Sequence, residues 1–154
     1  MMEIYTDGSC GQGVGPGGWS FVVLKERTYI FGDFEGLEKT SIGFLEAMAV
    51  FMAISWCKQH QAKATIFCDS QYIVKAINEW IPVWKNNGWR KSNNKQVLNL
   101  ELIQRIDRIL PEVGDLVKVV WVPGHSNNFG NNMAHDMANL AKNNVKKNLQ
   151  LQSA

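Results

Sequence analysis

An almost wholly apolar segment, residues 44–57 (FLEAMAVFMAISWC), constrains the fold more than any other feature of the sequence. It is apolar on nearly every face, and its Ala, Met and Leu content favours a helix over a strand. A helix without a polar face is stable only when it is buried, so this segment predicts an interior helix. The 154 residues are enough for one domain with a single substantial core.

The pattern around this helix predicts an α/β fold. A β-rich hairpin is followed by alternating strands and helices, which implies a mixed five-stranded sheet flanked by helices. The glycine-rich residues 11–18 are expected to form a loop. The expected elements are strands at 3–6, 19–24, 28–34, 64–68 and 117–122, and helices at 44–57, 71–79, from Pro82 to near Gly88, 97–110 (stopped by Pro111) and 133–140. We place one domain at residues 1–142 and expect a polar, flexible tail at 143–154.

Composition excludes several classes of protein. No apolar run approaches the roughly 20 residues that a membrane span needs. The N-terminus lacks the basic and apolar stretches of a signal peptide. The chain has three widely spaced cysteines, Cys10, Cys57 and Cys68, which argues against a disulfide framework or a zinc site. We therefore expect a cytoplasmic protein without a membrane segment.

Positive charge is grouped although the net charge is only +2. Four basic residues and no acidic one lie between Trp80 and Leu100, and three tryptophans interleave with them. Clustered cations predict a polyanion partner, and a solvated surface is the alternative. Aromatic rings beside cations suit sugar and phosphate contact, whereas packing against the core is the other explanation. The residues concerned are Lys85, Arg90, Lys91 and Lys95, with Trp80, Trp84 and Trp89.

Carboxylates occupy positions that packing does not explain. Asp7 and Asp69 each follow an expected strand, where α/β sheets form ligand sites, although turn formation is an alternative. Glu46 is the only charged residue of its apolar helix, where an ionised carboxylate is costly unless it is paired or bound to a cation. A solvent-facing stripe at the helix start is the other explanation for Glu46. Asp136, near the start of the last helix, is a fourth candidate.

Four convergent carboxylates would raise each other's pKa until a divalent cation neutralised them. An oxygen-only set indicates Mg²⁺ or Mn²⁺ rather than Zn²⁺. Two such ions about 4 Å apart can activate a water and stabilise the leaving oxygen of a phosphodiester. His125, in an expected loop, could shuttle protons. We assign no role to His60 or His135, and we expect His135 to point away from its neighbour Asp136.

Several motifs occur in a fixed order: YTDGSC followed by GPGG, then CDSQYIVKAINEWIPVWKNNGWRK, then WVPGH followed by NNMAHDMA. From Glu3 to about Ala141 the chain thereby closely resembles bacterial type 1 ribonuclease H with a basic protrusion. The resemblance implies a ribonuclease H-like fold and a monomer that cuts the RNA strand of RNA–DNA hybrids. It further implies a two-ion mechanism with Mg²⁺, which Mn²⁺ can replace, leaving 5′-phosphate and 3′-hydroxyl ends. The family's metal-binding carboxylates fall on Asp7, Glu46, Asp69 and Asp136, and its loop histidine falls on His125.

The resemblance also implies substrate contacts. About residues 80–99 match the basic protrusion, which holds the DNA strand of the hybrid. Ser41 and Asn99 fall near positions that grip a DNA phosphate, and Gln71 and Asn132 fall near the minor groove, where 2′-hydroxyls distinguish RNA. The expected contacts are Cys10, Ser41, Gln71, Trp80, Trp84, Lys85, Trp89, Arg90, Lys91, Lys95, Asn99 and Asn132.

The chain departs from the family in three places. Residues 41–44 read Ser-Ile-Gly-Phe instead of Thr-Asn-Asn-Arg, and Gly13 replaces an asparagine, so asparagines that touch the RNA strand are absent. Asp136 follows His125 by 11 positions, one more than is usual. We expect the metal chemistry to be intact. The alternatives are a nuclease of the same fold with relaxed duplex specificity, and a non-catalytic hybrid-binding module.

Overall fold

The computed structural model describes residues 1–124 and 127–153 and contains one five-stranded mixed sheet. The strand order is β3-β2-β1-β4-β5. The first three strands are antiparallel, and β4 and β5 run parallel to β1, as the sequence predicted. The strands are β1 (Met2–Cys10), β2 (Gly15–Lys25), β3 (Thr28–Thr40), β4 (Ala64–Cys68) and β5 (Val117–Trp121).

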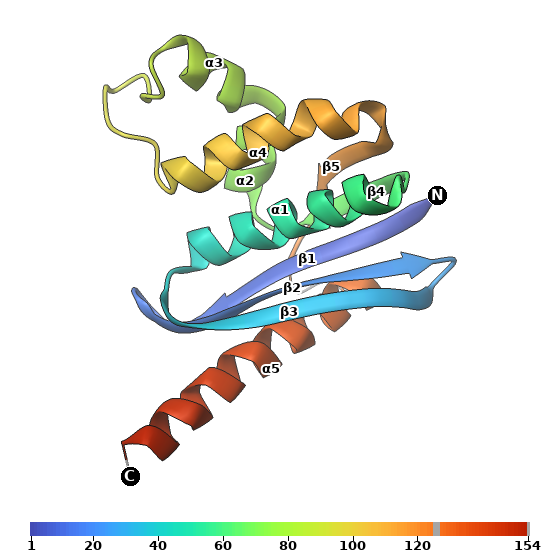
Figure 1. The fold of residues 1–154 in the computed structure, drawn as a ribbon, viewed down its shortest axis with the longest axis vertical. Helices are drawn as coiled ribbons and strands as arrows, with labels where there is room; N and C mark the ends of the chain where they lie inside the picture. The colour runs from blue at the N-terminus through green and yellow to red at the C-terminus, as the bar shows by residue number, and fades with distance from the viewer. Residues whose placement is uncertain (125–126, 154) are drawn as a thin grey trace.

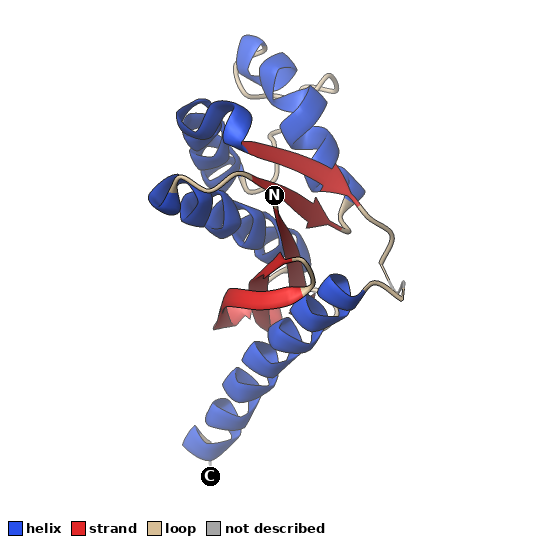
Figure 2. Cartoon of the chain, turned by 90° about the vertical axis from the view of Figure 1, so that its right-hand side faces the viewer, coloured by secondary structure: helices blue, strands red, loops and turns tan. Residues whose placement is uncertain are grey.

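Helices cover both faces of this sheet (Figure 1). α1 lies between one face of the sheet and α4, and α5 crosses the opposite face, which Figure 2 shows from the side. The α-helices are α1 (Ile42–His60), α2 (Gln71–Lys75), α3 (Ile81–Asn86), α4 (Leu100–Val113) and α5 (Phe129–Gln152). A π-helical turn, η1 (Ala76–Trp80), joins α2 to α3, and a 3-10 turn, η2 (Gly114–Leu116), precedes β5. No helix in the described part of the chain is long and apolar enough to cross a membrane.

The predicted interior helix is confirmed, because α1 forms the centre of the larger core. Leu45, Val50 and Ile54 of α1 are fully buried. They belong to one cluster with Ile66 of β4 and Ile106 of α4. Fully burying a side chain of this size contributes roughly 1.5–3 kcal/mol, so the apolar composition of α1 is explained by burial on both of its sides.

Small residues let α5, the helix on the opposite face of the sheet, pack closely against β2 and β3. A Cβ atom on Gly18 would lie 2.6 Å from the carbonyl oxygen of Ala138, and one on Gly36 would lie 2.3 Å from the side chain of Val145. The Ser20 hydroxyl donates a hydrogen bond to the carbonyl of Ala134. The backbone of α5 therefore lies almost directly on β2 and β3, which fixes which side chains of α5 reach β1.

Several predicted boundaries are wrong, and residues 143–152 are helical rather than a flexible tail. β1 continues to Cys10 and β3 to Thr40, instead of ending at Thr6 and Phe34, because both pair with β2 along their length. β2 begins at Gly15, inside the expected glycine loop, because its glycines leave room for α1 and α5 to approach. α4 continues past Pro111, since the buried Val113 packs its last turn against the core. α5 continues from Phe129 to Gln152 instead of ending near residue 140, because β3 gives its later turns a surface to pack on.

Candidate active site

The candidate site lies where β4 ends, beside Asp7 within β1. Thr6 pairs with Cys68 in parallel register, so Asp7 and Asp69 follow side by side on neighbouring strands. Asp7 is only 6% exposed, and its Oδ1 atom accepts a hydrogen bond of 2.8 Å from the backbone N–H of Gly8. Both carboxylates line one pocket of about 270 Å³. The sequence expectation that they lie together is confirmed.

Glu46 reaches the same pocket from α1 because Gly8 lets the helix come close. A Cβ atom on Gly8 would lie 2.9 Å from the Cβ of Leu45 and 3.1 Å from the backbone nitrogen of Glu46. The first turn of α1 thus packs against the backbone of β1. Ser70, which caps α2 by accepting a hydrogen bond from Ile73, also hydrogen bonds to the Glu46 carboxyl.

Burial and mutual repulsion shape the electrostatics of this pocket. Burial and, secondarily, the charge of Asp69 raise the pKa of Asp7 to about 6. Hydrogen bonds from Gly8 and His135 act in the opposite direction. Burial raises the pKa of Glu46 to about 7, with added repulsion from Asp69 and Asp7. Negative charge is therefore in excess here.

These carboxylates fit a hard divalent cation by their chemistry. All three offer oxygen ligands, and a cation would relieve the repulsion that raises two of their pKa values. Within the described residues, no three His, Cys, Asp or Glu side chains lie as close together as the ligands of one metal ion do.

The described side chain of α5 that reaches this pocket belongs to His135, to which the sequence assigned no role, and not to the predicted Asp136. The His135 Nδ1 atom lies 3.0 Å from Oδ2 of Asp7. Asp136 is exposed and is not among the described residues that line the pocket. Adjacent helical residues point about 100° apart, so the packing of Ala134 and Ala138 on the sheet brings position 135 to the pocket and turns position 136 away.

The spacing of the sequence contained a signal for this arrangement. Counting from His125 to Asp136 required a loop one residue longer than usual, whereas His135 lies ten positions after His125 and requires no insertion. A second signal is that His135 and Asn139 are four residues apart, and therefore share one helix face.

His125 itself, predicted to shuttle protons, lies outside the described residues. Its neighbour Gly124 does lie at the site, because a Cβ atom there would be 3.1 Å from Oδ2 of Asp69. A role for His125 stays a prediction.

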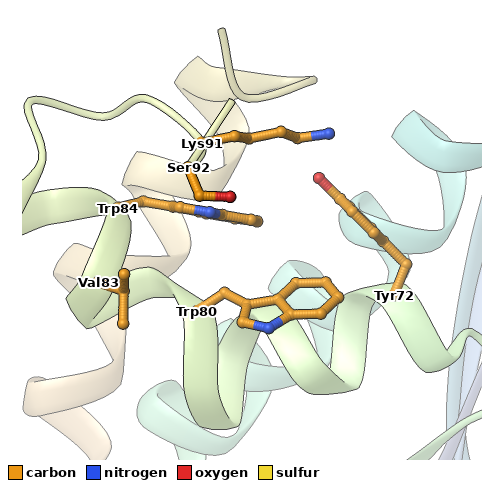
Figure 3. Close-up of a pocket in the computed structure, with 6 residues that line it drawn as sticks. All are labelled: Tyr72, Trp80, Val83, Trp84, Lys91 and Ser92. Atoms are coloured by element: carbon orange, nitrogen blue, oxygen red, sulfur yellow. The ribbon is translucent and has the colours of Figure 1, made fainter. Parts of the chain in front are cut away.

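A second pocket, of about 350 Å³, lies in the tryptophan-rich segment (Figure 3). The rings of Trp80 and Trp84 are 5.7 Å apart, and Tyr72 meets Trp80 edge-on at 5.5 Å. The Lys91 ammonium lies 5.8 Å from the centre of the Tyr72 ring. Trp84 is only 6% exposed, so it packs in the core and also forms part of the pocket wall. The lining residues are Tyr72, Trp80, Val83, Trp84, Lys91 and Ser92.

The other basic residues of this segment differ in whether they already have a partner within the protein. Lys85 forms an ion pair of 3.1 Å with Asp107 of α4, an acidic partner that the local sequence did not reveal. Arg90 donates a hydrogen bond to the carbonyl of Asn94, and both Arg90 and Lys95 are exposed. Trp89 is partly buried against the core and does not line the pocket.

Comparison with known proteins identifies this arrangement. The model of the family described as RNase H matches residues 1–143. The chain belongs to the RNase H family. Its curated relatives include the ribonuclease H of Verminephrobacter eiseniae, 40% identical over 139 residues that cover 90% of this chain and 88% of the relative. The ribonuclease H of Salmonella arizonae is 36% identical and covers 92% of this chain and 88% of the relative.

Solved structures support the same fold. This RNase H superposes with a TM-score of 0.80 and 22% identity on the foamy viral protease-reverse transcriptase, over 92% of this chain and 20% of that longer one. It also superposes on LC11-RNase H1 with a TM-score of 0.72 and 20% identity, over 94% of this chain and 99% of that one. Family membership makes the chain a nuclease, an enzyme that hydrolyses phosphodiester bonds, and the family generally uses divalent metal ions.

The remaining predicted contacts of this RNase H do not line the carboxylate pocket. Ser41 and Asn99 precede α1 and α4, and the Asn99 amide lies next to the first turn of α1, 3.5 Å from where a Cβ on Gly43 would be. Cys10 is half-buried with its Sγ 3.6 Å from the carbonyl of Thr40. Gln71 and Asn132 are exposed, in the first turns of α2 and α5.

Proposed function

We propose that this RNase H hydrolyses the RNA strand of RNA–DNA hybrids as a monomeric endonuclease. The observation that carries the proposal is the convergence of Asp7, Glu46 and Asp69 in one pocket beside the end of β4. Family membership supports the reaction, and LC11-RNase H1, which has the same fold, was solved in complex with an RNA/DNA hybrid. The residues we assign to the site all belong to one chain.

Asp7, Glu46 and Asp69 would hold two Mg²⁺ ions, which Mn²⁺ could replace. Bound ions of this kind activate the attacking water and stabilise the departing 3′ oxygen, which yields 5′-phosphate and 3′-hydroxyl ends. Asp7 and Asp69 would both contribute oxygen ligands, because their adjacent positions bring them to one pocket. We assign proton transfer to His125. We leave Asp136 out of the metal-binding set, because His135 lies at the pocket in its place.

Substrate binding would extend from the carboxylates to the tryptophan-rich protrusion, about residues 80–99. Lys91 and the rings of Tyr72 and Trp80 form a wall of aromatic surface next to a cation, which suits a nucleic-acid backbone. We assign the DNA strand to this wall. Ser41 and Asn99 together would grip one of its phosphates.

The decisive experiment compares cleavage of matched RNA–DNA, RNA–RNA and DNA–DNA duplexes in Mg²⁺ and in Mn²⁺. We expect the hybrid to be cut at least about 100-fold faster than the other duplexes, because hydrogen bonds to 2′-hydroxyls and duplex shape discriminate strongly. Equal rates on all duplexes would establish the relaxed-specificity nuclease instead. Binding of the hybrid without cleavage of any duplex would leave only a binding module.

One observation favours the relaxed-specificity alternative. Ile42 is 45% exposed and lines the carboxylate pocket, where its apolar side chain offers no hydrogen bond to a 2′-hydroxyl. The same assay on Ile42→Asn tests this point, because an amide at that position should raise the preference for the hybrid. An unchanged preference would show that position 42 does not read the RNA strand.

The protrusion is tested by its dependence on salt. Replacing Lys85, Arg90 and Lys91 with Ala should weaken hybrid binding and reduce the slope of log K against log[salt] by about 2–3, since each phosphate contact contributes roughly 0.7–0.9. Lys91 should contribute most and Lys85 least, because Asp107 already pairs with Lys85.

A matched control removes the same charge from other exposed surfaces, in the triple variant Lys25→Ala, Lys58→Ala and Lys118→Ala. Binding is measured by fluorescence anisotropy across a salt series. A slope that changes equally in both triple variants would mean that net charge, not the protrusion, governs binding.

A further inference from the structure

A continuous chain of side-chain hydrogen bonds connects β1 to α5 and returns to Asp7. The Ser9 hydroxyl bonds to Oδ1 of Asn139. The Nδ2 atom of Asn139 lies 3.0 Å from Nε2 of His135. The Nδ1 atom of His135 lies 3.0 Å from Oδ2 of Asp7. Two residues of one strand are thus linked through two residues of one helix.

The donor and acceptor chemistry of these four side chains fixes the direction of each hydrogen bond. The Asn139 Nδ2 group only donates, so Nε2 of a neutral His135 ring accepts and the ring proton is on Nδ1. That proton points at the Asp7 carboxylate. The Asn139 carbonyl oxygen accepts from Ser9, which fixes the orientation of the amide. Each member therefore determines the hydrogen-bonding role of the next.

Backbone geometry places the four residues in register. Asp7 and Ser9 are two residues apart on β1 and share one face of the sheet, and His135 and Asn139 are one turn apart on α5. The close approach of α5 to Gly18 brings these pairs within hydrogen-bonding distance. The arrangement is built by two packed elements rather than by a loop.

We propose that His135, oriented by Asn139 and Ser9, is the positioning residue that holds the Asp7 carboxylate for cation binding. The cation site then contains three carboxylates and an imidazole N–H donor in place of a fourth carboxylate, so it carries less mutual repulsion than four carboxylates would. The proposal rests on the proposed function, because it requires that Asp7 bind the cation. Positioning groups of this kind are typically worth 10–100-fold in metal affinity.

Calorimetric titration of the full chain with Mg²⁺ and with Mn²⁺, without nucleic acid, tests the proposal. We expect His135→Ala to weaken binding about 10-fold or more. His135→Asn should recover most of the affinity, because its amide N–H₂ can stand near the place of Nδ1. Asn139→Ala should cause a smaller loss, because it releases the ring without removing the donor. His60→Ala is the control, since His60 stacks on Trp56 at the far end of α1.

Spectroscopy of the Mn²⁺-loaded protein separates positioning from direct ligation. Pulsed electron paramagnetic resonance should detect no imidazole nitrogen coupling that depends on His135. A coupling present in the wild type and lost in His135→Ala would make His135 a metal ligand and overturn the proposal. Equal affinity of wild type and His135→Ala would also overturn it, as would a loss in Asp136→Asn without one in His135→Ala.

The failure of the proposed cation site gives a different result. If Asp7→Asn binds Mg²⁺ as tightly as the wild type, then Asp7 is not a ligand and the proposed function loses its carboxylate centre. If Asp7→Asn loses affinity while His135→Ala does not, the cation site stands and only the positioning role fails.

Discussion

Asp7→Asn is expected to lower the rate of hybrid cleavage at least about 1,000-fold while leaving the protein folded. That loss corresponds to about 4 kcal/mol of transition-state stabilisation, a reasonable share for a carboxylate that would hold the catalytic ions. Asparagine has the same shape and keeps an oxygen for the hydrogen bond from Gly8. The substitution therefore keeps the shape of the side chain but removes its charge and, because N–H₂ takes the place of Oδ2, the hydrogen bond from His135.

Single-turnover cleavage of a labelled hybrid measures this effect, with Asp33→Asn as the matched control. Asp33 makes the same local hydrogen bond, because its Oδ1 accepts from the backbone N–H of Phe34 at 2.9 Å, but it lies on β3 away from the pocket. Asp33→Asn should retain wild-type activity. Retention of near wild-type cleavage by Asp7→Asn would remove Asp7 from the mechanism.

The same substitution should make the protein more stable in the absence of divalent cations. The pKa values of Asp7 and Glu46 in the folded state, about 6 and about 7, exceed their ordinary values. The folded state therefore binds more protons than the unfolded state between about pH 4 and 7, and the free energy of unfolding falls as pH rises through that window. Asp7→Asn removes one of the two contributions, which amounts to about 3 kcal/mol at pH 8.

Urea denaturation with EDTA at pH 5 and pH 8 checks whether the free energy of unfolding falls as pH rises. The wild type should lose more stability than Asp7→Asn between these values, and Mg²⁺ should restore the stability of the wild type at pH 8. A variant that is less stable than the wild type at pH 8 would contradict the electrostatic account of the pocket.

Gly18→Ala is expected to destabilise the protein by about 3 kcal/mol, the second large effect. The added Cβ atom would lie 2.6 Å from both the Ala138 carbonyl oxygen and the Ala141 side chain. Backbone and a short side chain cannot rotate away, so α5 must move off the sheet, and overpacking of this kind costs about 1–3 kcal/mol or more. The displacement also moves His135 away from Asp7, so metal affinity should fall together with stability.

Gly11→Ala is the control for this experiment, because nothing lies within 4 Å of a Cβ atom on Gly11. It should change the free energy of unfolding, measured in urea, by no more than about 0.5 kcal/mol. Equal effects of the two substitutions would mean that α5 tolerates a larger separation from the sheet than its packing indicates.

The sequence by itself determined the type and order of the main elements and the three carboxylates at the pocket. Strand alternation and the apolar composition of 44–57 are local patterns, and they predicted the mixed sheet and the buried α1. Asp69 was predictable because it directly follows a strand, whereas Asp7, also predicted from a strand end, lies within β1 and reaches the site because β1 and β4 are parallel neighbours. Glu46 was predictable because a single charge in an apolar helix requires a partner.

Tertiary structure alone decided which residue of α5 faces Asp7. Helical periodicity predicts that positions 135 and 136 point in different directions. Which of them faces Asp7 depends on the rotation of α5 about its axis, and the glycines of β2 and β3 on which α5 packs set that rotation. Likewise, the sequence predicted that Lys85 contacts the substrate, whereas the structure shows that α4 places Asp107 beside it as an ion-pair partner. Both outcomes depend on contacts between segments far apart in the chain, because packing between elements, not local pattern, sets the direction in which a side chain points.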